Sequence, residues 1–418
     1  MILKSDADIA DSQTIWHQRL YLPIAAIAIA ASAFHFWPFG NSRIWRVLNL
    51  PNLACIGVLV VQILISISKK TNSPISSSLP HVSVFAYLAV NFLSIAFAAG
   101  LFRSVSFTIK LSIVLTGGCV LFSLAAANER SIKTIYYLAT VAAATSVGAC
   151  LFRRFAQATS SFGFFESLYK YGSYIGILVP LGGIYLLSSR KTVEIFLGMV
   201  LIVCAYLSSG SIGAVAAITS GLLSALIFNR KRTAKLLVVI SLALSTAALL
   251  AAGPAFFKNV WDDFKLLETD GKNLRQRYIE WQAEINLLES RGITGTGPGC
   301  INDYRSNFYY RLPKLNTLEA FDQNGWLTVA AETGILGLIT FCWIIIHYGG
   351  TAVTMIFNID PVREPFAHRF AAAAMAALVS ACTANLFSSV HYNGVLIVFV
   401  LVLSLISAVN KVYIKGYR

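Results

Sequence analysis

The sequence predicts an all-α polytopic membrane protein with about twelve transmembrane helices and one large, partly helical periplasmic loop. Of its 418 residues, 56% are hydrophobic and only 12% are charged, whereas a soluble domain carries roughly 25% charged residues. The mean hydropathy is +0.68. The apolar residues come in runs that lack the alternation of an outer-membrane barrel. These observations exclude a cytosolic enzyme, a disordered chain and a disulfide-stabilised scaffold.

Twelve apolar runs are long enough, at about 1.5 Å per residue, to cross about 30 Å of hydrocarbon. They cover residues 20–38, 49–67, 81–101, 107–127, 133–152, 173–189, 192–208, 212–228, 236–254, 325–347, 369–388 and 394–410. Spans one to nine therefore occupy residues 1–254, a polar loop occupies 255–324, and spans ten to twelve occupy 325–418.

Positive charge predicts the orientation of these spans. With both termini in the cytoplasm, the inner segments hold 17 of the 33 Lys and Arg residues, and the short outer segments hold 7. The other 9 lie in the long loop, and long loops cross a membrane with little regard to charge. We therefore expect both termini inside and residues 255–324 outside. This clustering also accounts for the net charge of +14 without a nucleic-acid partner.

Two basic residues break the charge bias. Arg153 and Arg154 follow the fifth span on its outer side. They indicate a span boundary shifted by a few residues, ordinary statistical tolerance of the charge bias, or an anion site on the outer face.

The cysteines indicate neither a disulfide framework nor a metal site. Six of the seven lie in apolar runs, and only Cys300 lies in the long loop, so no internal disulfide closes that loop. No pair of cysteines has the spacing of metal ligands. The sequence predicts no metal and no cofactor.

An amphipathic helix is predicted in the long loop over residues 273–290. Its apolar residues recur at steps of three and four and draw one stripe, formed by Leu274, Tyr278, Trp281, Ile285 and Leu288. Arg277 precedes Trp281 by four residues, so the two side chains can lie against each other. We expect the helix to form a lid on the membrane face. Whether Arg277 also points into a binding site stays open at this stage.

Two further segments of the loop have polar or aromatic character. Residues 292–299, GITGTGPG, lack the Lys-Ser/Thr of a phosphate-binding loop and predict a tight turn back to the membrane. The stretch with Tyr304, Arg305, Tyr309, Tyr310 and Arg311 suits sugars and phosphates, but it equally suits a membrane-interface belt.

The chain returns to the bilayer at Asp322, Gln323 and Asn324. Asp322 or Asn324 is a suitable helix cap. Glu332 follows as the one acid well inside a span. An ion-coupled transporter usually needs more such groups.

From Arg277 to Gly337 the chain resembles the O-antigen ligase and polymerase superfamily. The resemblance rests on three motifs, namely Arg277-x3-Trp281, the glycines Gly295-x-Gly297-x-Gly299, and residues 324–337, which read NGWLTVAAETGILG. The twelve spans with a large outer loop before span ten agree with it.

Two positions depart from the pattern of that family. The family usually has His-Asn where the chain returns to the bilayer, and this chain has Gln323-Asn324. The family often has Ser-Arg-Gly at the start of span eight, and this chain has Ser211-Ile212-Gly213. The usual candidate base and one usual cation are therefore missing, while Arg277 remains.

The resemblance implies a metal-independent glycosyltransferase of the bacterial inner membrane that moves a glycan from undecaprenyl diphosphate to a sugar hydroxyl. Arginine suits the charge that develops on the diphosphate, because it stays charged and binds phosphate oxygens bidentately. The candidate substrate-binding residues around Arg277 are Arg153, Arg154, Arg305, Arg311, Trp281 and Asn324.

The site offers more than one candidate for the proton acceptor. Gln323 cannot accept a proton, but it can hold a sugar hydroxyl. Asp322 beside it can accept one, and so can His391 in the turn between spans eleven and twelve, unless His391 is only an interfacial residue. No strong base is needed if the bond to the diphosphate breaks ahead of attack.

Four functions are compatible with these residues. The first is a polymerase that joins lipid-linked repeat units into O-antigen or exopolysaccharide, with a chain-length regulator and a flippase as partners. The second is a ligase that transfers the glycan to lipid A core or to protein. The third is a transporter or flippase of lipid-linked glycans, and the fourth is an inactive relative with a binding role.

Overall fold

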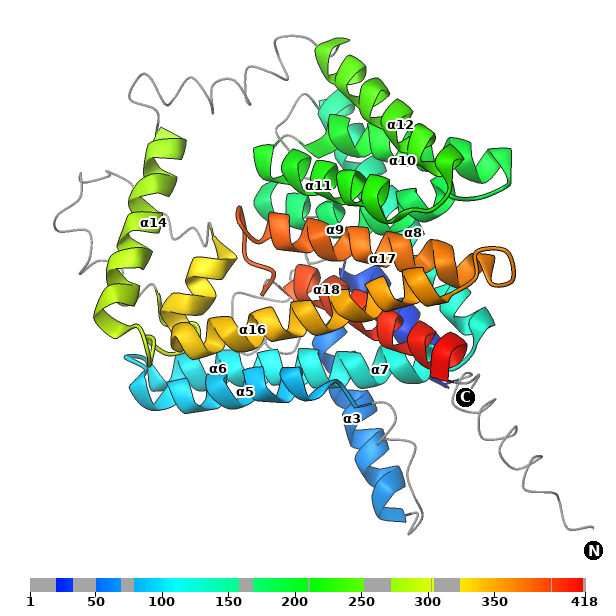
Figure 1. Cartoon of the computed structure of the whole chain (residues 1–418). Helices are drawn as coiled ribbons and strands as arrows, with labels where there is room; N and C mark the ends of the chain where they lie inside the picture. The colour runs from blue at the N-terminus through cyan, green and yellow to red at the C-terminus, as the bar shows by residue number, and fades with distance from the viewer. Residues whose placement is uncertain are drawn as a thin grey trace, which may run out of the picture.

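The long apolar runs form the helices of the protein, shown in a computed structural model (Figure 1). The structure describes residues 20–32, 50–68, 79–157, 168–209, 211–251, 272–301, 303, 324–391 and 393–415. Within these ranges there is no β-strand, and residues 20–32 are helical. The other α-helices are α3 (Leu50–Ser68), α5 (Val82–Ser94), α6 (Leu101–Ser112), α7 (Gly118–Ala125), α8 (Glu129–Gln157), α9 (Leu168–Leu187), α10 (Thr192–Ser209), α11 (Ile212–Phe228), α12 (Arg232–Ala251), α14 (Lys272–Arg291), α16 (Gly325–Asn358), α17 (Pro365–Ala384) and α18 (Asn393–Asn410). The shorter elements are the 3₁₀ turn η1 (Ile95–Phe97) and the π-helical stretches η2 (Ile113–Gly117) and η3 (Lys411–Lys415).

Seven of the described helices are long and apolar enough to cross a membrane. They cover Leu101–Ala125, Glu129–Arg153, Thr192–Ser209, Arg232–Leu249, Gly325–Asn358, Pro365–Ala384 and Gly394–Ile414. Four shorter apolar helices cover Leu20–Ser32, Asn52–Gln62, Val82–Phe97 and Ile212–Phe228. The all-α, multi-pass architecture is thus confirmed, and the count of twelve spans stays a prediction.

Small residues allow α9, α11 and α17 to pack closely at the centre of the bundle. A Cβ on Gly221 of α11 would lie 2.1 Å from Ser380 Oγ of α17, and a Cβ on Gly172 of α9 would lie 2.9 Å from the Ala214 side chain of α11. Ser380 Oγ donates a hydrogen bond of 2.6 Å to the carbonyl of Ala217. Such close contacts between small residues are typical of helices packed in membranes, where lipid supplies no hydrophobic driving force between helices.

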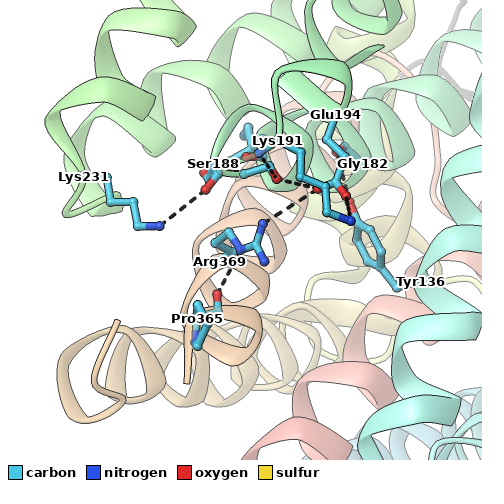
Figure 2. Close-up of polar contacts among 10 residues, drawn as sticks. Tyr136, Gly182, Ser188, Lys191, Glu194, Lys231, Pro365 and Arg369 are labelled. Atoms are coloured by element: carbon cyan, nitrogen blue, oxygen red, sulfur yellow. Dashed lines mark hydrogen bonds and ion pairs between the residues drawn. The ribbon is translucent and has the colours of Figure 1, made fainter. Parts of the chain in front are cut away.

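The helix ends sort into two groups. At one end, the turn after α9 contacts the turn after α11, because Asn229 Nδ2 donates to Ser188 Oγ at 2.8 Å. Arg369 near the start of α17 reaches Glu194 at the start of α10 (Figure 2). We call this group, residues 188–191, 229–231 and 358–369, the basic end. The inner segments predicted around residues 190, 230 and 363 therefore share one end of the bundle.

The other group of helix ends carries the long loop. The turn between η1 and α6 contacts the segment after α14, and the start of α16 contacts the turn after α17 through a 2.7 Å bond from Gly325 N–H to the carbonyl of Asn385. We call this group, residues 97–100, 291–301, 324–325 and 385–391, the loop end. Figure 1 shows α14 standing at this end of α16.

Candidate active site at the glycine loop and the broken helix

Helix α16 is broken near its start. Gly334 has φ 72° and ψ −177°, which is not helical, so a short helix of residues 325–333 and a long helix of residues 335–358 meet there (Figure 1). The sequence predicted one continuous span that began at residue 325, and that prediction missed the break. A break in a membrane helix leaves peptide groups that need partners, because lipid offers none.

The glycine loop, residues 292–299, supplies those partners. Its N–H groups at Thr296 and Gly297 donate to the carbonyls of Ala331 and Glu332, at 3.0 and 2.9 Å. Its carbonyl at Gly292 accepts a 2.8 Å bond from the N–H of Ile335, which opens the second part of α16. The segment predicted as a tight turn is therefore also a cap for both parts of a broken helix.

Only glycine fits at the closest approach of these two segments. Gly295 has φ +67°, and a Cβ on it would lie 2.3 Å from the carbonyl oxygen of Glu332. A Cβ on Gly334 would lie 2.1 Å from the carbonyl oxygen of Ile293. Both positions thus combine a left-handed backbone with a backbone contact that leaves no room for a side chain.

The far side of the glycine loop is fixed to the start of α6. Arg103 and Asp303 form an ion pair at 2.5 Å. The buried Cys300 places its Sγ 3.5 Å from the carbonyl of Gly100. Burial, and then the nearby carboxylates of Asp303 and Glu332, raise the pKa of the Cys300 thiol. The loop is thus held between α6 on one side and α16 on the other.

Asn324 begins α16 next to the turn that follows α17. Its Oδ1 accepts hydrogen bonds from the N–H groups of Trp326 and Leu327, at 3.1 and 3.3 Å, as a helix cap does. The Trp326 indole donates to the carbonyl of Cys382 at 3.1 Å. These contacts bring the point where the chain returns to the bilayer against the turn that carries His391, and Asn324 caps the helix as predicted.

His391 is buried at the loop end and both of its ring nitrogens have partners. Nε2 lies 3.0 Å from the hydroxyl of Tyr87 on α5, and Nδ1 lies 3.2 Å from the hydroxyl of Ser389. The rings of Phe107 and Phe341 flank it at 6.2 and 5.6 Å. Burial, and then the positive charge of Lys110, lower the pKa of His391 to about 4. His391 is therefore neutral at pH 7, and among the described residues its ring nitrogens contact the hydroxyls of Tyr87 and Ser389.

One lysine predicted only as a topology signal lies near His391. The positive charge of Lys110 on α6 acts on His391. Lys110 Nζ also lies 5.9 Å from the centroid of the Phe107 ring. A lysine within a membrane helix is a functional-site signal in its own right, and that signal was present in the sequence. Tyr87 gave no such signal, since nothing in the sequence pairs it with a residue 304 positions away.

Helix α14 carries the Arg277 motif. Its observed bounds, Lys272–Arg291, agree with the predicted helix over 273–290. Its buried face is formed by Ala283, Glu284 and Leu287, while Ile285 of the predicted stripe is 37% exposed. Leu287 packs with Ile301 and Ala331, so the helix packs on the glycine loop and on α16 and leaves part of its apolar stripe outside.

The other candidate residues differ in how far the structure describes them. Trp281 is half-buried, and its indole nitrogen has no hydrogen-bond partner among the described residues. Arg153 is exposed at the end of α8. Arg277 and Arg154 lie on described helices, but their side chains lie outside the described set, as do the whole of Asp322, Gln323, Arg305 and Arg311.

The position of the missing family arginine also lies at the loop end. Ser211 caps α11 by accepting from the N–H of Ala214 at 3.2 Å, and a Cβ on Gly213 would touch the side chain of Phe387 at 2.5 Å. A small cleft of about 10 Å³, enough for one water, is lined by Ser173, Ser211, Gly213, Ala214, Ala384, Phe387 and Ser388. Within the described ranges no group of three or more His, Cys, Asp or Glu side chains is arranged to hold a metal.

A comparison with protein-family models gives one match, to the O-antigen ligase family over residues 197–342. The matched segment begins in α10 and ends in α16, so it contains α14, the glycine loop and the break at Gly334. No curated protein is significantly similar to the chain in sequence. The match confirms the resemblance that the motifs from Arg277 to Gly337 indicated. Residues 197–342 of this multi-pass membrane protein are thus similar to the O-antigen ligase family, and the similarity covers about a third of the chain.

Proposed function

We propose that the protein is a polymerase that joins oligosaccharide repeat units carried on undecaprenyl diphosphate into a surface polysaccharide, O-antigen or exopolysaccharide. The observation that carries the proposal is the O-antigen ligase match over the segment in which α14 and the glycine loop pack on the broken α16. The absence of the usual family histidine at Gln323 favours a divergent polymerase over a ligase.

The proposed reaction exchanges one bond for another. The bond between the sugar anomeric carbon and the diphosphate oxygen breaks, and a hydroxyl oxygen of the acceptor sugar bonds to that carbon. The hydroxyl proton passes to a base, and undecaprenyl diphosphate leaves with the bonding electrons. The chain must therefore offer cations to the diphosphate and an acceptor for one proton.

Cations at the loop end suit the first requirement. Arg277 is the principal candidate, because its guanidinium can bind two phosphate oxygens at once. Lys110 adds a charge that lies close to His391. Arg153, Arg154, Arg305 and Arg311 are the further candidates, and Trp281 on α14 offers an aromatic face to a sugar.

Proton transfer has two candidate routes. Asp322 precedes the helix cap Asn324 by two residues, and a carboxylate in a dehydrated site has a pKa suited to accepting a proton. His391 offers the second route, through the hydroxyl of Tyr87 on its Nε2. Gln323 and Asn324 are placed in the proposal as hydrogen-bond partners of the acceptor sugar.

The proposed location is the bacterial inner membrane, with the loop end in the periplasm. The charge split of 17 against 7 supports this orientation. A lipid-linked donor would reach that face through a flippase, and the length of the product would depend on a chain-length regulator, so these two activities are the proposed partners.

A deletion strain analysed for polymer length tests the proposal. Loss of long chains, with single repeat units still attached to the cell surface, is the result expected of a polymerase. Accumulation of full-length chains on undecaprenyl diphosphate would show a ligase instead. Accumulation of repeat units on the cytoplasmic side of the membrane would show a flippase. Complementation with the wild-type chain is the control for effects on neighbouring genes.

A further inference from the structure

The basic end of the bundle carries a cluster of positive charge that the proposed reaction does not use. Arg190, Arg230 and Lys231 come from the turns after α9 and α11, and His368 and Arg369 come from the first turns of α17. Figure 2 shows Lys231 and Arg369 converging on the segment from Ser188 to Glu194. These residues lie at the end of the helices opposite the glycine loop.

Part of this charge has a structural role. The guanidinium of Arg369 lies 4.8 Å from the Tyr185 ring centroid, donates from Nε to the carbonyl of Pro365 at 3.0 Å and reaches Glu194 at 4.0 Å (Figure 2). The side chain of Arg369 is only 16% exposed. Arg369 therefore holds α17 against α9 and α10, and it is not free to bind a ligand.

The rest of the charge is poorly balanced. His368 is 1% exposed, and its Nε2 has no hydrogen-bond partner among the described residues. The charges of Arg230, Lys231 and Asp360 act on it. A buried imidazole nitrogen without a partner costs free energy, so its retention among cations points to a ligand that supplies the missing bond.

Lys231 shows the same imbalance. Its pKa is lowered, first by burial and then by the positive charges of Arg369 and Arg190. Among the described residues, its Nζ contacts the carbonyl of Ser188, at 3.5 Å. Two of the acids at this end have other partners, since Asp360 lies 3.7 Å from Arg363 and Glu194 binds Ser189 and Lys191.

We propose that Arg230, Lys231 and His368 form a binding site for a phosphate group, and that its occupant is the headgroup of an acidic phospholipid. Arg230 is exposed, Lys231 is half-buried and His368 is buried. The first turn of α17, which opens with Pro365, adds N–H groups that point outward and favour an anion.

The surroundings favour a lipid over a soluble phosphate. Large apolar side chains next to the site face outward, with exposed fractions of 73% for Ile227, 59% for Phe357 and 60% for Leu236. The guanidinium of Arg230 lies 5.2 Å from the Phe357 ring centroid and its Nη2 donates to the Phe357 carbonyl at 3.4 Å. Acyl chains can therefore lie along these side chains while the headgroup phosphate meets the cations.

Lipid titration of the purified full-length protein tests the site. Affinity for phosphatidylglycerol and for cardiolipin would be measured by native mass spectrometry, with phosphatidylcholine as the neutral comparison. The Arg230→Gln/Lys231→Gln variant is expected to bind the acidic lipids about 30-fold more weakly, because each basic residue near an anionic headgroup contributes about fivefold. Arg130→Gln/Lys411→Gln removes two exposed charges from the same end of the bundle and is expected to change the affinity less than threefold.

Three results would overturn the proposal. Equal losses in the two double variants would mean that only the general positive charge attracts lipid. No loss in either would mean that the site holds no headgroup. Full competition by inorganic phosphate at matched ionic strength would mean that the occupant of the site is a soluble phosphate and not a lipid.

His368→Gln, which keeps a polar group at this position, is expected to weaken lipid binding without changing the elution volume of the protein.

Discussion

Arg277 is the single residue on which the proposed chemistry depends most. Arg277→Ala is expected to abolish the polymer while the protein still accumulates in the membrane. Arg277→Lys is also expected to perform poorly, because an ammonium cannot reproduce bidentate binding of phosphate. The measurement is polymer length on gels beside the amount of membrane-inserted protein. Arg275→Ala, two residues away and so on another face of α14, is the matched control.

Near-normal polymer in Arg277→Ala would reduce Arg277 to a residue on the surface of α14. Equal loss in Arg275→Ala would show that the helix as a whole, and not the guanidinium of Arg277, is required. Either result leaves the similarity to the O-antigen ligase family intact, since that match covers residues 197–342 and does not depend on one side chain.

The proton acceptor is tested by a comparison of variants. General-base help is typically worth about 10²–10⁴-fold in rate, so Asp322→Asn is expected to lower the transfer rate by at least about 10²-fold, with Gln323→Ala milder. The assay is transfer from a lipid-linked donor by purified protein across pH. If Asp322→Asn keeps rate and pH profile while His391→Ala and Tyr87→Phe lose activity together, the proton leaves through Tyr87 to His391. If none of them changes the rate, proton removal is not limiting.

His391 also makes a prediction about stability. Its pKa in the folded protein is about 4, against about 6.5 for an unperturbed histidine. Between these values the unfolded chain binds a proton that the folded protein does not, so stability is retained above pH 6.5 and falls as the pH drops toward 4, by up to about 3 kcal/mol. Thermal unfolding of His391→Gln in detergent should show a shallower fall over this window than the wild type. An identical slope in both proteins would contradict the buried, neutral state of His391.

At the level of elements, the sequence predicted an all-α architecture and the helix α14, but not the break in α16. The 3.6-residue period predicted α14 to within one residue at each end, because its stripe and its polar flanks are local properties. The break in α16 depends on partners from the glycine loop, which lies about 40 residues upstream and contacts Glu332 and Ile335 only in the folded protein. A positive φ at Gly334 has no signature in a hydropathy pattern, so AETGILG reads as continuous helix.

The parts of the site that depend on nearby residues in the sequence were predictable. The parts that depend on packing between distant segments were not. Asn324 was expected at a helix start and caps α16. His391 was expected at the outer turn, but its burial and its bond to Tyr87 depend on packing between α5 and the turn after α17. Lys110 carried the signal of a charge in an apolar run. The buried face of α14 differs from the predicted stripe, because Leu287 packs against Ile301 and against Ala331 of α16.

The junction of the glycine loop and α16 is testable by single substitutions. Gly295→Ala is expected to destabilise the protein by about 1–3 kcal/mol, because it combines a left-handed backbone with a Cβ 2.3 Å from the carbonyl oxygen of Glu332. Gly349→Ala, in the same α16 and with open space around its Cβ, is the control and is expected to be neutral or stabilising by up to about 1 kcal/mol. Thermal unfolding in detergent gives both values. Equal stability of the two variants would mean that the loop does not dock on the break.

At the scale of the whole molecule, topology decides whether the proposed site faces its substrate. The loop over residues 255–324 is predicted outside and both termini inside. Cysteines placed at positions 262–272 should react with a membrane-impermeant maleimide in intact cells with a permeabilised outer membrane, above the background of the seven native cysteines. Val362→Cys, 73% exposed at the basic end, is the inside control and should react only after the inner membrane is lysed. The reverse pattern would invert the topology and remove the proposed site from the periplasm.

The way the glycine loop closes the break in α16 bears on permeability. Broken helices in ion-coupled transporters leave peptide dipoles free to replace the water around an ion. Here the carbonyls of Ala331 and Glu332 and the N–H of Ile335 are already occupied by the chain itself. The bend can thus redirect α16 without creating a hydrated path for ions. Such a bend leaves the membrane able to hold a proton gradient. The closed break therefore favours an enzyme that acts at the membrane surface over a transporter.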